Sequence, residues 1–477
     1  MTHDEYVAHD AMGLAKLVAD RQVSASELLD AALARTAAVN PEIHALNHLF
    51  ENRARADIAN GLAAGPFHGV PFVLKDLYMA YAGEPTANGS RFWADNVPAH
   101  SSELFERYRR AGFAIFAKSA TPELGYSATT EPANAPPTRN PWDLSRTAGG
   151  SSGGAAAAVA AGIVPLAHAS DSGGSIRIPA SCCGLFGLKP TRGRMPMGPE
   201  RGESSAGLGT AHAVSRSVRD SAALLDISAG PDLGAPYGIA PPARPWLSEI
   251  GADPGKVRIA LIVDLPGEDP AHADCRDAVQ DTAALCETLG HHVEPASLPI
   301  DRELLAAASS VVAATLVRAL VDGRAHELGR RPRDGELEPH VVALVEAAQT
   351  IGSADYLRAT QYFQKVSRDL AAFQSRYPLI LSPALAQPPV PLGTLTGAAA
   401  NIRSLSTSFA PYSAIANIAG IPAMSVPLFR NGAGLPIGSQ FMARFGDEAL
   451  LFRLAAQLEA ARPWKDVLPA LSKAEGC

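Results

Sequence analysis

The chain has 477 residues, 47% hydrophobic and 19% charged, which is enough to bury a sizeable core in one large or two ordinary domains. A formal net charge of −7, with no basic run and no interleaving of basic and aromatic residues, argues against a nucleic-acid-binding protein. The cysteines are odd in number and lack zinc-ligand spacing, which argues against a disulfide framework and a metal site; they are Cys182, Cys183, Cys275, Cys286 and Cys477.

The N-terminus lacks a cationic segment followed by an apolar one, so we expect no signal peptide. The longest apolar run, 155–167, contains Gly162 and Pro165 and is shorter than the roughly 20 residues that span a bilayer. We therefore expect a soluble, cytoplasmic protein with no membrane and no nucleic-acid partner.

In chain order, residues 1–65 predict a helical segment that packs on the core. Ser24 and Glu27 fit a capping box, and Asn40-Pro41 is expected to end that helix. The segment 70–78 then predicts a short strand that carries Lys75. A predicted helix at 101–112 and a strand at 113–118 continue an alternation that is typical of an α/β fold.

The segment 121–142 is rich in Pro, Asn and Thr and predicts a long loop. It leads directly into the first of two Gly-Gly-Ser clusters. A long loop that adjoins such a cluster is a candidate wall of a binding pocket.

The two Gly-Gly-Ser clusters lie within 147–194, with their first serines at Ser151 and Ser175. Between them, 153–162 predicts about three turns of helix and 163–168 a short buried strand. A loop, a helix, a strand and a second loop in this order can bring both serines to one end of the unit. Glycine lets backbone N–H groups approach a reacting oxygen, so Ser172, Gly173, Gly174 and Ser175 are predicted to form an oxyanion hole beside a nucleophile.

This stretch resembles the signature of the amidase signature family. The resemblance implies a Ser-cisSer-Lys triad, with Ser175 as the nucleophile, Ser151 as the bridging serine that follows a cis peptide bond, and Lys75 as the base. It also implies that Ser152, Asp171 and Arg177 support these groups, although a structural ion pair is an equally good interpretation of Asp171 and Arg177. The chemistry requires no cofactor and no metal.

The resemblance extends over most of the chain and is densest at 66–230 and 409–445. It is most similar to the stand-alone amidases of the 6-aminohexanoate cyclic dimer hydrolase type, through Thr129–Pro132 and Arg139–Trp142. It implies a central mixed, mostly parallel β-sheet covered by helices on both faces. We divide the chain into the helical segment 1–65, an amidase signature core at 66–235, a variable helical and α/β section at 240–395 that shapes the pocket, and a C-terminal part of the core at 396–477, all in one compact unit.

Lysine can act as a base only when it is neutral, and burial lowers its pKa from about 10.4. We therefore expect Lys75 to be buried and hydrogen-bonded to Ser151, which would relay a proton between Lys75 and Ser175. The one histidine near the serine clusters in sequence, His168, lies in an apolar strand and is expected to pack there.

The predicted activity is hydrolysis of small-molecule amides through a covalent acyl-enzyme, which releases a carboxylic acid and an amine or ammonia. The same triad is compatible with esters and with carbamates, as in a urethanase. The alternative is the A-type subunit of a glutamine-dependent amidotransferase, which acts with a partner. A nucleotide-binding module is disfavoured because 184–191 lacks the Gly-Lys-Thr adjacency of a phosphate loop. The oligomeric state stays open, with a homodimer as one option.

Overall fold

The computed structural model of the chain describes residues 1–396 and 402–473. The predicted C-terminal segment 396–477 therefore lies partly outside the described residues, and so does Cys477. The four-part division of the chain stays a prediction.

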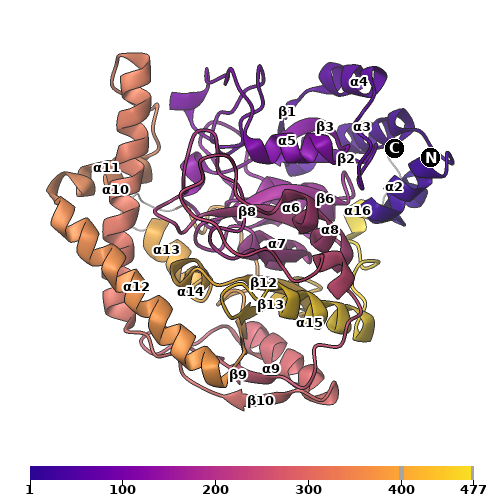
Figure 1. The fold of residues 1–477 in the computed structure, drawn as a ribbon. Helices are drawn as coiled ribbons and strands as arrows, with labels where there is room; N and C mark the ends of the chain where they lie inside the picture. The colour runs from indigo at the N-terminus through magenta and orange to yellow at the C-terminus, as the bar shows by residue number, and fades with distance from the viewer. Residues whose placement is uncertain (397–401, 474–477) are drawn as a thin grey trace.

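A sheet of eight strands runs through the centre of the molecule (Figure 1). In spatial order its strands are β10 (His292–Pro295), β9 (Arg258–Leu261), β11 (Leu379–Pro383), β13 (Pro436–Ala443), β12 (Ala423–Arg430), β7 (Phe186–Lys189), β8 (Thr210–Ser215) and β6 (Leu166–Asp171). A three-stranded sheet, in the order β1 (Leu46–Leu49), β3 (Ala114–Ser119) and β2 (Pro71–Lys75), continues past β6, with β2 nearest to it. Helices cover both faces of the sheet, which confirms the predicted α/β class.

The sheet is mixed, as predicted. β9 runs parallel to β10 and to β11, and β2 runs parallel to β3. The other pairs within these two sheets are antiparallel, so among the described strands antiparallel neighbours outnumber the parallel ones that we expected to prevail. The physical reason is visible at β12 and β13, which are joined by a short turn in which Asn431 Oδ1 accepts from Ala433 N and Leu435 N, and short turns join only antiparallel strands.

The N-terminal segment 1–65 forms four helices, and the third and fourth of these pack against β2 and β3. They are α1 (His3–Val7), α2 (Ala11–Ala19), α3 (Ala25–Ile43) and α4 (Glu51–Asn60). The predicted capping box is present, because Ser24 accepts from Glu27 N and the Glu27 side chain accepts from Ser24 N. The predicted end at Asn40-Pro41 is wrong: the helix includes Pro41 and ends at Ile43, since a proline in the last turn removes only one backbone hydrogen bond.

The part of the chain around the two serine clusters contains several short helices. They are α5 (Glu103–Arg110), α6 (Gly153–Ala160), α7 (Arg177–Cys183) and α8 (Val218–Ser228), with 3-10 turns η1 (Arg91–Trp93), η2 (Glu123–Gly125) and η3 (Trp246–Glu249). The predicted loop 121–142 contains η2 and the strand β4 (Arg139–Asn140), which pairs with β5 (Asp143–Thr147).

The later part of the chain adds helices around the other end of the sheet. They are α9 (Ala273–Thr288), α10 (Arg302–Leu328), α11 (Pro339–Ala347), η4 (Ala348–Thr350), α12 (Ser353–Arg376), α13 (Ile402–Phe409), α14 (Ala414–Ala419) and α15 (Glu448–Ala461). The last helix, α16 (Ala470–Lys473), lies instead beside the N-terminal helices, where Ser472 O is hydrogen-bonded to His3 Nε2. By length and composition alone, α10 could cross a membrane: its most apolar window has a mean hydropathy of 2.0 and is 33% buried. Core helices of soluble proteins pass the same test, and α10 packs against α11 and α12 in an outer layer (Figure 1).

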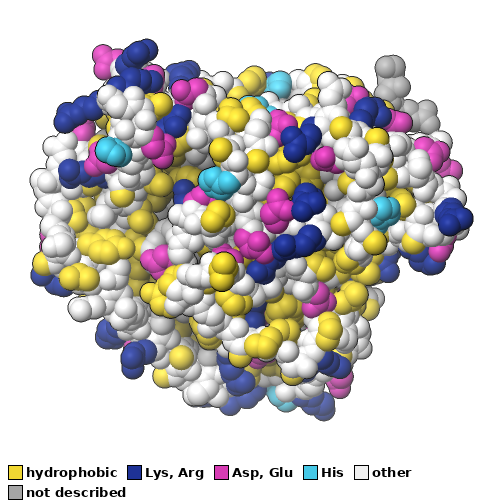
Figure 2. Space-filling model, turned by 45° about the horizontal axis from the view of Figure 1, so that its top comes forward, with side chains coloured by type: hydrophobic (Ala, Val, Ile, Leu, Met, Phe, Trp, Pro, Cys, Tyr) yellow, Lys and Arg dark blue, Asp and Glu magenta, His cyan; other side chains and the backbone are white. Residues whose placement is uncertain are grey.

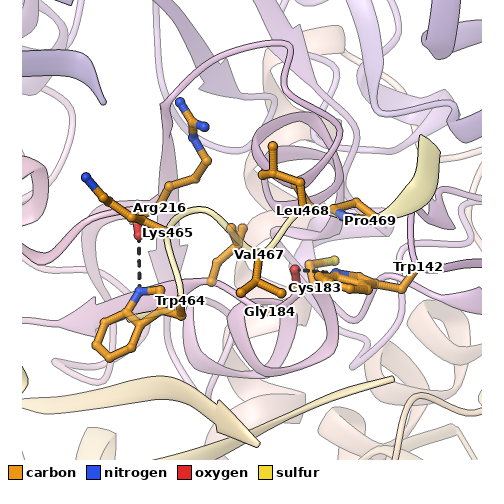
Figure 3. A pocket seen from close by; sticks show the side chains of 11 residues that line it. Trp142, Cys183, Gly184, Arg216, Trp464, Lys465, Val467, Leu468 and Pro469 are labelled. Carbon is orange, nitrogen blue, oxygen red and sulfur yellow. Dashed lines mark hydrogen bonds between the residues drawn. The ribbon is translucent and has the colours of Figure 1, made fainter. Parts of the chain in front are cut away.

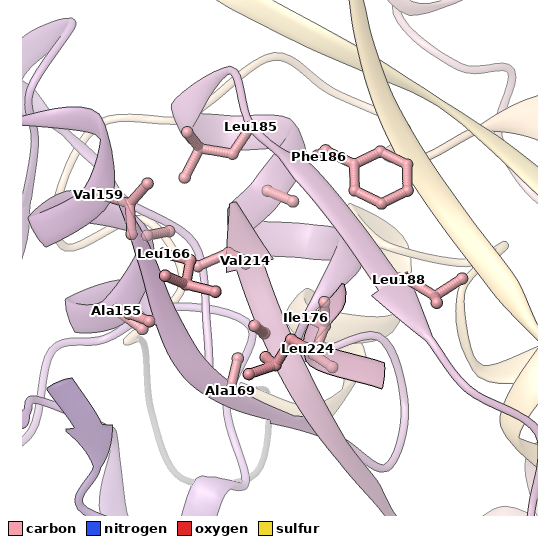
Figure 4. Packing of buried hydrophobic residues seen from close by; sticks show 14 of the residues in the cluster. Ala155, Val159, Leu166, Ala169, Ile176, Leu185, Phe186, Leu188, Val214 and Leu224 are labelled. Carbon is pink, nitrogen blue, oxygen red and sulfur yellow. The ribbon is translucent and has the colours of Figure 1, made fainter. Parts of the chain in front are cut away.

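One hydrophobic core draws residues from all four predicted segments, among them Leu28, Phe72, Ile259 and Phe441. Figure 4 shows the part of this core that lies beneath the serine clusters, where side chains of α6, β6, β7 and β8 interdigitate. Small residues dominate α6, so the helix can lie close to the strands beside it. The two serine loops therefore start from a closely packed layer.

We predict that Gly154→Ala destabilises the fold, because a Cβ on Gly154 would lie 2.5 Å from Ala45 O and also collide with the backbone of Ala120. The expected loss is roughly 1–3 kcal/mol of unfolding free energy, as for other overpacked sites. Gly323→Ala in α10 is the matched control, since no atom lies within 4 Å of its added Cβ, and it should gain up to about 1 kcal/mol of helix stability. Denaturant titration measures both. Unchanged stability of Gly154→Ala would contradict the close approach of α6.

Candidate active site

Lys75, the last residue of β2, is completely buried. Its Nζ donates to Ser151 Oγ at 2.7 Å and to Ser170 Oγ at 3.0 Å. Burial lowers the pKa of Lys75 to about 7, against the opposing effect of the Asp171 carboxylate. A lysine in this position is therefore neutral in a substantial fraction of molecules at neutral pH, as a base requires.

The hydrogen-bond partners of Lys75 differ from those of two other buried lysines. Lys118 Nζ donates to Pro85 O at 2.6 Å and to Thr86 Oγ1, and Lys189 Nζ donates to Pro190 O at 2.6 Å. Burial also lowers the pKa of these lysines, to about 8 and about 7. Among the three, only Lys75 contacts a serine of the Gly-Gly-Ser clusters, so the contact, and not the pKa, identifies it.

The peptide bond between Gly150 and Ser151 is cis, as the family resemblance predicted. Thr130, from the long loop 121–142, holds the residues on both sides of this bond: its Oγ1 donates to Gly149 O at 2.9 Å and accepts from Gly153 N at 3.1 Å. Ser152 Oγ donates to Ser170 O at 3.2 Å and so ties the loop to β6. The supporting role of Ser152 stays a prediction.

Asp171 organises the turn that carries Ser175. Its carboxylate accepts from Gly174 N at 2.7 Å and from Ile176 N at 3.1 Å, and so from the residues on both sides of Ser175. Arg177 donates to both carboxylate oxygens, at 2.9 and 3.0 Å, and both side chains are fully buried. Burial alone would raise the pKa of Asp171, but the Arg177 guanidinium holds that pKa well below its usual range. The pair thus braces the turn, and the supporting role predicted for it stays a prediction.

Residues that sequence reasoning did not select complete this network. Arg177 also donates to Ser413 O at 2.7 Å, to Gln440 Oε1 at 2.5 Å and to Asn417 Oδ1 at 2.7 Å, and Asn417 Nδ2 donates to Asp171 Oδ1 at 2.9 Å. The signal for them was the similarity of 409–445 to the family, which gave no role to a particular side chain. The C-terminal segment thus holds the Ser175 turn directly.

The predicted oxyanion hole needs one correction. The N–H of Gly174 is engaged by Asp171, so it is not free to bind a substrate oxygen. Gly174 instead has a φ of +127°, and a Cβ there would collide with the Ser413 side chain, so this position requires glycine. In contrast, no atom lies within 4 Å of a Cβ built on Gly173, so the turn is open on that side.

Ser175 is half-buried, at the turn between β6 and α7. Within residues 1–396 and 402–473, its hydroxyl makes no hydrogen bond to protein, so the predicted contact between Ser151 and Ser175 is not formed in this structure. The structure thus brings Lys75, Ser151, Ser152 and Ser170 together, and it holds Ser175 on an adjacent braced turn.

His168 does more than pack in its strand. Its Nδ1 accepts from the backbone N–H of Lys75 at 3.1 Å, so it bridges β6 and β2 just before the lysine side chain. Burial, and then the nearby Lys75, lower the pKa of His168 to about 3, which keeps the ring neutral and Nδ1 able to accept. Sequence reasoning missed this contact because nothing in the sequence shows that β2 lies beside β6.

Two other features of the surface lie apart from this site. Figure 3 shows a pocket between α7 and the segment 464–469, in which Trp142 Nε1 donates to Cys183 O and Trp464 Nε1 donates to Arg216 O. It contains none of the predicted site residues.

In Figure 2 acidic and basic side chains are interspersed over the visible face, and the described part of the chain holds no cluster of ligands that could bind a metal.

Comparison with known proteins places these features in context. The family model described as "Amidase" matches residues 27–452. The chain is 37% identical to a 6-aminohexanoate-cyclic-dimer hydrolase of Paenarthrobacter ureafaciens, over 97% of this chain and 96% of that one. It is 34% identical to an acylamidase of Rhodococcus erythropolis, over 96% and 97%. A solved structure of 6-aminohexanoate cyclic dimer hydrolase with substrate superposes with a TM-score of 0.92 at 33% identity, over 98% and 99% of the two chains.

We predict that His168→Ala lowers kcat, because it leaves the buried N–H of Lys75 without an acceptor next to the lysine. Leaving a buried donor unpaired costs about 1–3 kcal/mol. If this whole cost is added to the activation free energy, kcat falls roughly 5- to 150-fold. His168→Asn is the matched variant, since Asn Oδ1 can take the place of Nδ1, and it should keep most of the activity. Steady-state kinetics on one amide would measure both; equal losses in the two variants would indicate a packing role only.

Proposed function

The chain belongs to the amidase family of amide-hydrolysing enzymes, and we propose that it cleaves small-molecule amides through a Ser-cisSer-Lys triad formed by Ser175, Ser151 and Lys75. The observation that carries this proposal is the 2.7 Å contact between Lys75 Nζ and Ser151 Oγ at a fully buried lysine. No other lysine that the structure describes as buried makes such a contact with the serine clusters.

In the proposed mechanism, neutral Lys75 takes the proton of Ser151 while Ser151 takes the proton of Ser175. Ser175 Oγ then attacks the amide carbonyl, and the resulting oxyanion accepts hydrogen bonds from the backbone N–H groups of Ser172, Gly173 and Ser175, without the N–H of Gly174. Ser151 returns a proton to the leaving nitrogen as the tetrahedral intermediate collapses. The amine departs and leaves an acyl-enzyme on Ser175.

Hydrolysis of the acyl-enzyme repeats the same proton transfers with water in place of Ser175. Lys75 and Ser151 activate the water, the ester bond to Ser175 breaks, and the carboxylic acid leaves. The chemistry of this cycle needs only proton transfer and oxyanion stabilisation.

The substrate class follows from the relatives. One of them is named for hydrolysis of the cyclic dimer of 6-aminohexanoate and another as an acylamidase. We propose that this chain acts on linear or cyclic amides of similar size, and that esters and carbamates are secondary substrates, since the acyl-enzyme forms from them in the same way. The cytoplasmic location and the homodimer stay predictions.

The amidotransferase-subunit alternative makes a different prediction. Such a subunit releases ammonia from glutamine when its partner is present, whereas the proposed enzyme acts alone. Purified chain that hydrolyses aryl and aliphatic amides, with no glutaminase activity, would support the stand-alone enzyme. Glutaminase activity without amide hydrolysis would favour the subunit.

We predict that Ser175→Ala, Ser151→Ala and Lys75→Ala each lower kcat by about 10³-fold or more, because each removes a member of one proton-transfer unit. A panel of aryl amides, aliphatic amides, p-nitrophenyl esters and carbamates provides the measurement. Ser310→Ala and Lys365→Ala, on exposed faces of α10 and α12, are the matched controls and should retain full activity. A Ser175→Ala variant with near-normal rates would show that the nucleophile is assigned wrongly.

The pH dependence follows from Lys75, whose folded-state pKa is lowered to about 7. The neutral amine is the active form, so kcat/KM should rise with pH through about 7 and reach a plateau above it. Lys75→Arg should be inactive across the whole range, since a guanidinium keeps its proton. A pH profile of kcat/KM on a neutral amide tests this. A profile that falls as pH rises through 7 would exclude a neutral lysine as the base.

A further inference from the structure

The segment 199–209 contacts two parts of the candidate site, the chain that follows Lys75 and the turn that carries Ser175. At one end, the Arg201 guanidinium lies over the ring of Tyr78, 3.9 Å from its centroid. In the middle of the segment, Ser205 Oγ accepts from Ser172 Oγ at 3.3 Å. The segment therefore touches the chain that follows Lys75 and also the turn that carries Ser175.

Arg201 has no carboxylate partner within the described residues, although acidic residues stand close to it in the sequence. Glu200 is hydrogen-bonded to His100 at 2.6 Å. Glu203 lies near Arg192, and its charge favours the protonated form of that arginine. Glu123, whose charge contributes to raising the pKa of Tyr78, accepts from Ser90 Oγ and from Glu338 N. Glu200 and Glu123 are thus engaged elsewhere, and among residues 1–396 and 402–473 Arg201 forms no salt bridge.

Stacking on an aromatic ring leaves the edge of a guanidinium available. The five N–H donors of arginine lie in the plane of the group, and within residues 1–396 and 402–473 those of Arg201 make no hydrogen bond besides the contact with the Tyr78 ring. Two of these donors match the oxygens of a carboxylate in a bidentate pair. Arg201 is half-buried, which reduces solvent competition for such a pair.

The geometry also indicates which part of a substrate would meet Arg201. Tyr78 follows Lys75 by one short turn, and Leu77 lies against Gly125, whose Cβ position is 3.2 Å from Ser151 Oγ. Through Tyr78, which follows Lys75 closely in the chain, we place Arg201 on the Lys75 and Ser151 side of the site. In the proposed mechanism that side returns the proton to the leaving nitrogen.

We propose that Arg201 and Tyr78 form a carboxylate subsite on the leaving-group side, so that the preferred substrates are amides whose amine portion carries a carboxylate. This inference rests on the proposed function and specifies its substrate class. The products would then be a carboxylic acid and an amino acid. Tyr78 holds the guanidinium in place, and Arg201 binds the carboxylate.

The test uses three anilides that share a leaving-group skeleton. The first is an N-acyl-4-aminobenzoate, the second is the corresponding 4-aminobenzamide, which is neutral, and the third is a 4-methylanilide whose carboxylate lies on the acyl side. The acyl group of the first two is the one that the wild-type enzyme cleaves fastest in the panel above. Steady-state kinetics are measured for wild type, Arg201→Gln and Arg201→Lys, and for Arg331→Gln as a control that changes net charge equally at an exposed position.

The expected result is that Arg201→Gln lowers kcat/KM for the 4-aminobenzoate amide about tenfold, mainly through KM, as for loss of a charge-assisted hydrogen bond. The neutral anilide should change less than about twofold, Arg201→Lys should be intermediate, and Arg331→Gln should match wild type. Raising the salt concentration should weaken the wild-type preference for the carboxylate.

Three results would overturn the proposal. Equal effects of Arg201→Gln on charged and neutral anilides would show a structural role. An effect confined to the acyl-side carboxylate would show that the subsite is on the other side. A wild-type enzyme that cleaves the neutral anilide and not the charged one would exclude the subsite while leaving the proposed function intact, whereas failure on every amide of the panel would contradict the proposed function itself.

Discussion

The buried ion pair between Asp171 and Arg177 is the interaction on which the candidate site depends. Removing two charges from water is costly, and the cost is offset here because every oxygen of the carboxylate and most of the guanidinium donors have close partners. Those partners come from β6, from the turn before α7, and from the C-terminal segment through Ser413, Asn417 and Gln440. One pair therefore fixes the backbone on both sides of Ser175 and joins it to α14 and β13, which follow much later in the chain.

The surroundings of Lys75, the other buried ionisable group of the site, have the opposite effect and favour its uncharged form. Asp171 is kept ionised by its partners, whereas Lys75 is pushed toward its neutral form because its contacts are hydroxyl groups and not carboxylates. The two groups are close enough for the carboxylate to oppose this shift, so the pKa of Lys75 stays near neutrality and does not fall further. The same carboxylate thus braces the nucleophile turn and moderates the proposed base.

The residues that we propose for bond cleavage and those that we propose for substrate specificity lie in different parts of the molecule. The groups proposed for bond cleavage are held by the sheet, by α6 and α7, and by the core beneath them (Figure 4). The proposed carboxylate subsite lies instead at Arg201, in the segment 199–209, whose Ser205 and Ala206 have positive φ. Within the described part of the chain, the Arg201 side chain makes no hydrogen bond to the turn that carries Ser175, so it can change without disturbing that turn.

The sequence alone determined the local features of this protein. The Gly-Gly-Ser clusters, the helix and strand between them, and the lysine in an apolar strand are patterns of neighbouring residues, and they sufficed to indicate the family, the α/β class and the residues proposed for the triad. Tertiary structure decided what depends on distant segments meeting. It set the antiparallel majority of strand pairs, the engagement of Gly174 N by Asp171, the acceptor role of His168 and the convergence of Ser413, Asn417 and Gln440 on Arg177. The physical reason is that backbone N–H groups and buried charges take whichever partner the packed chain brings within hydrogen-bonding distance, and one sequence does not state which strands become neighbours.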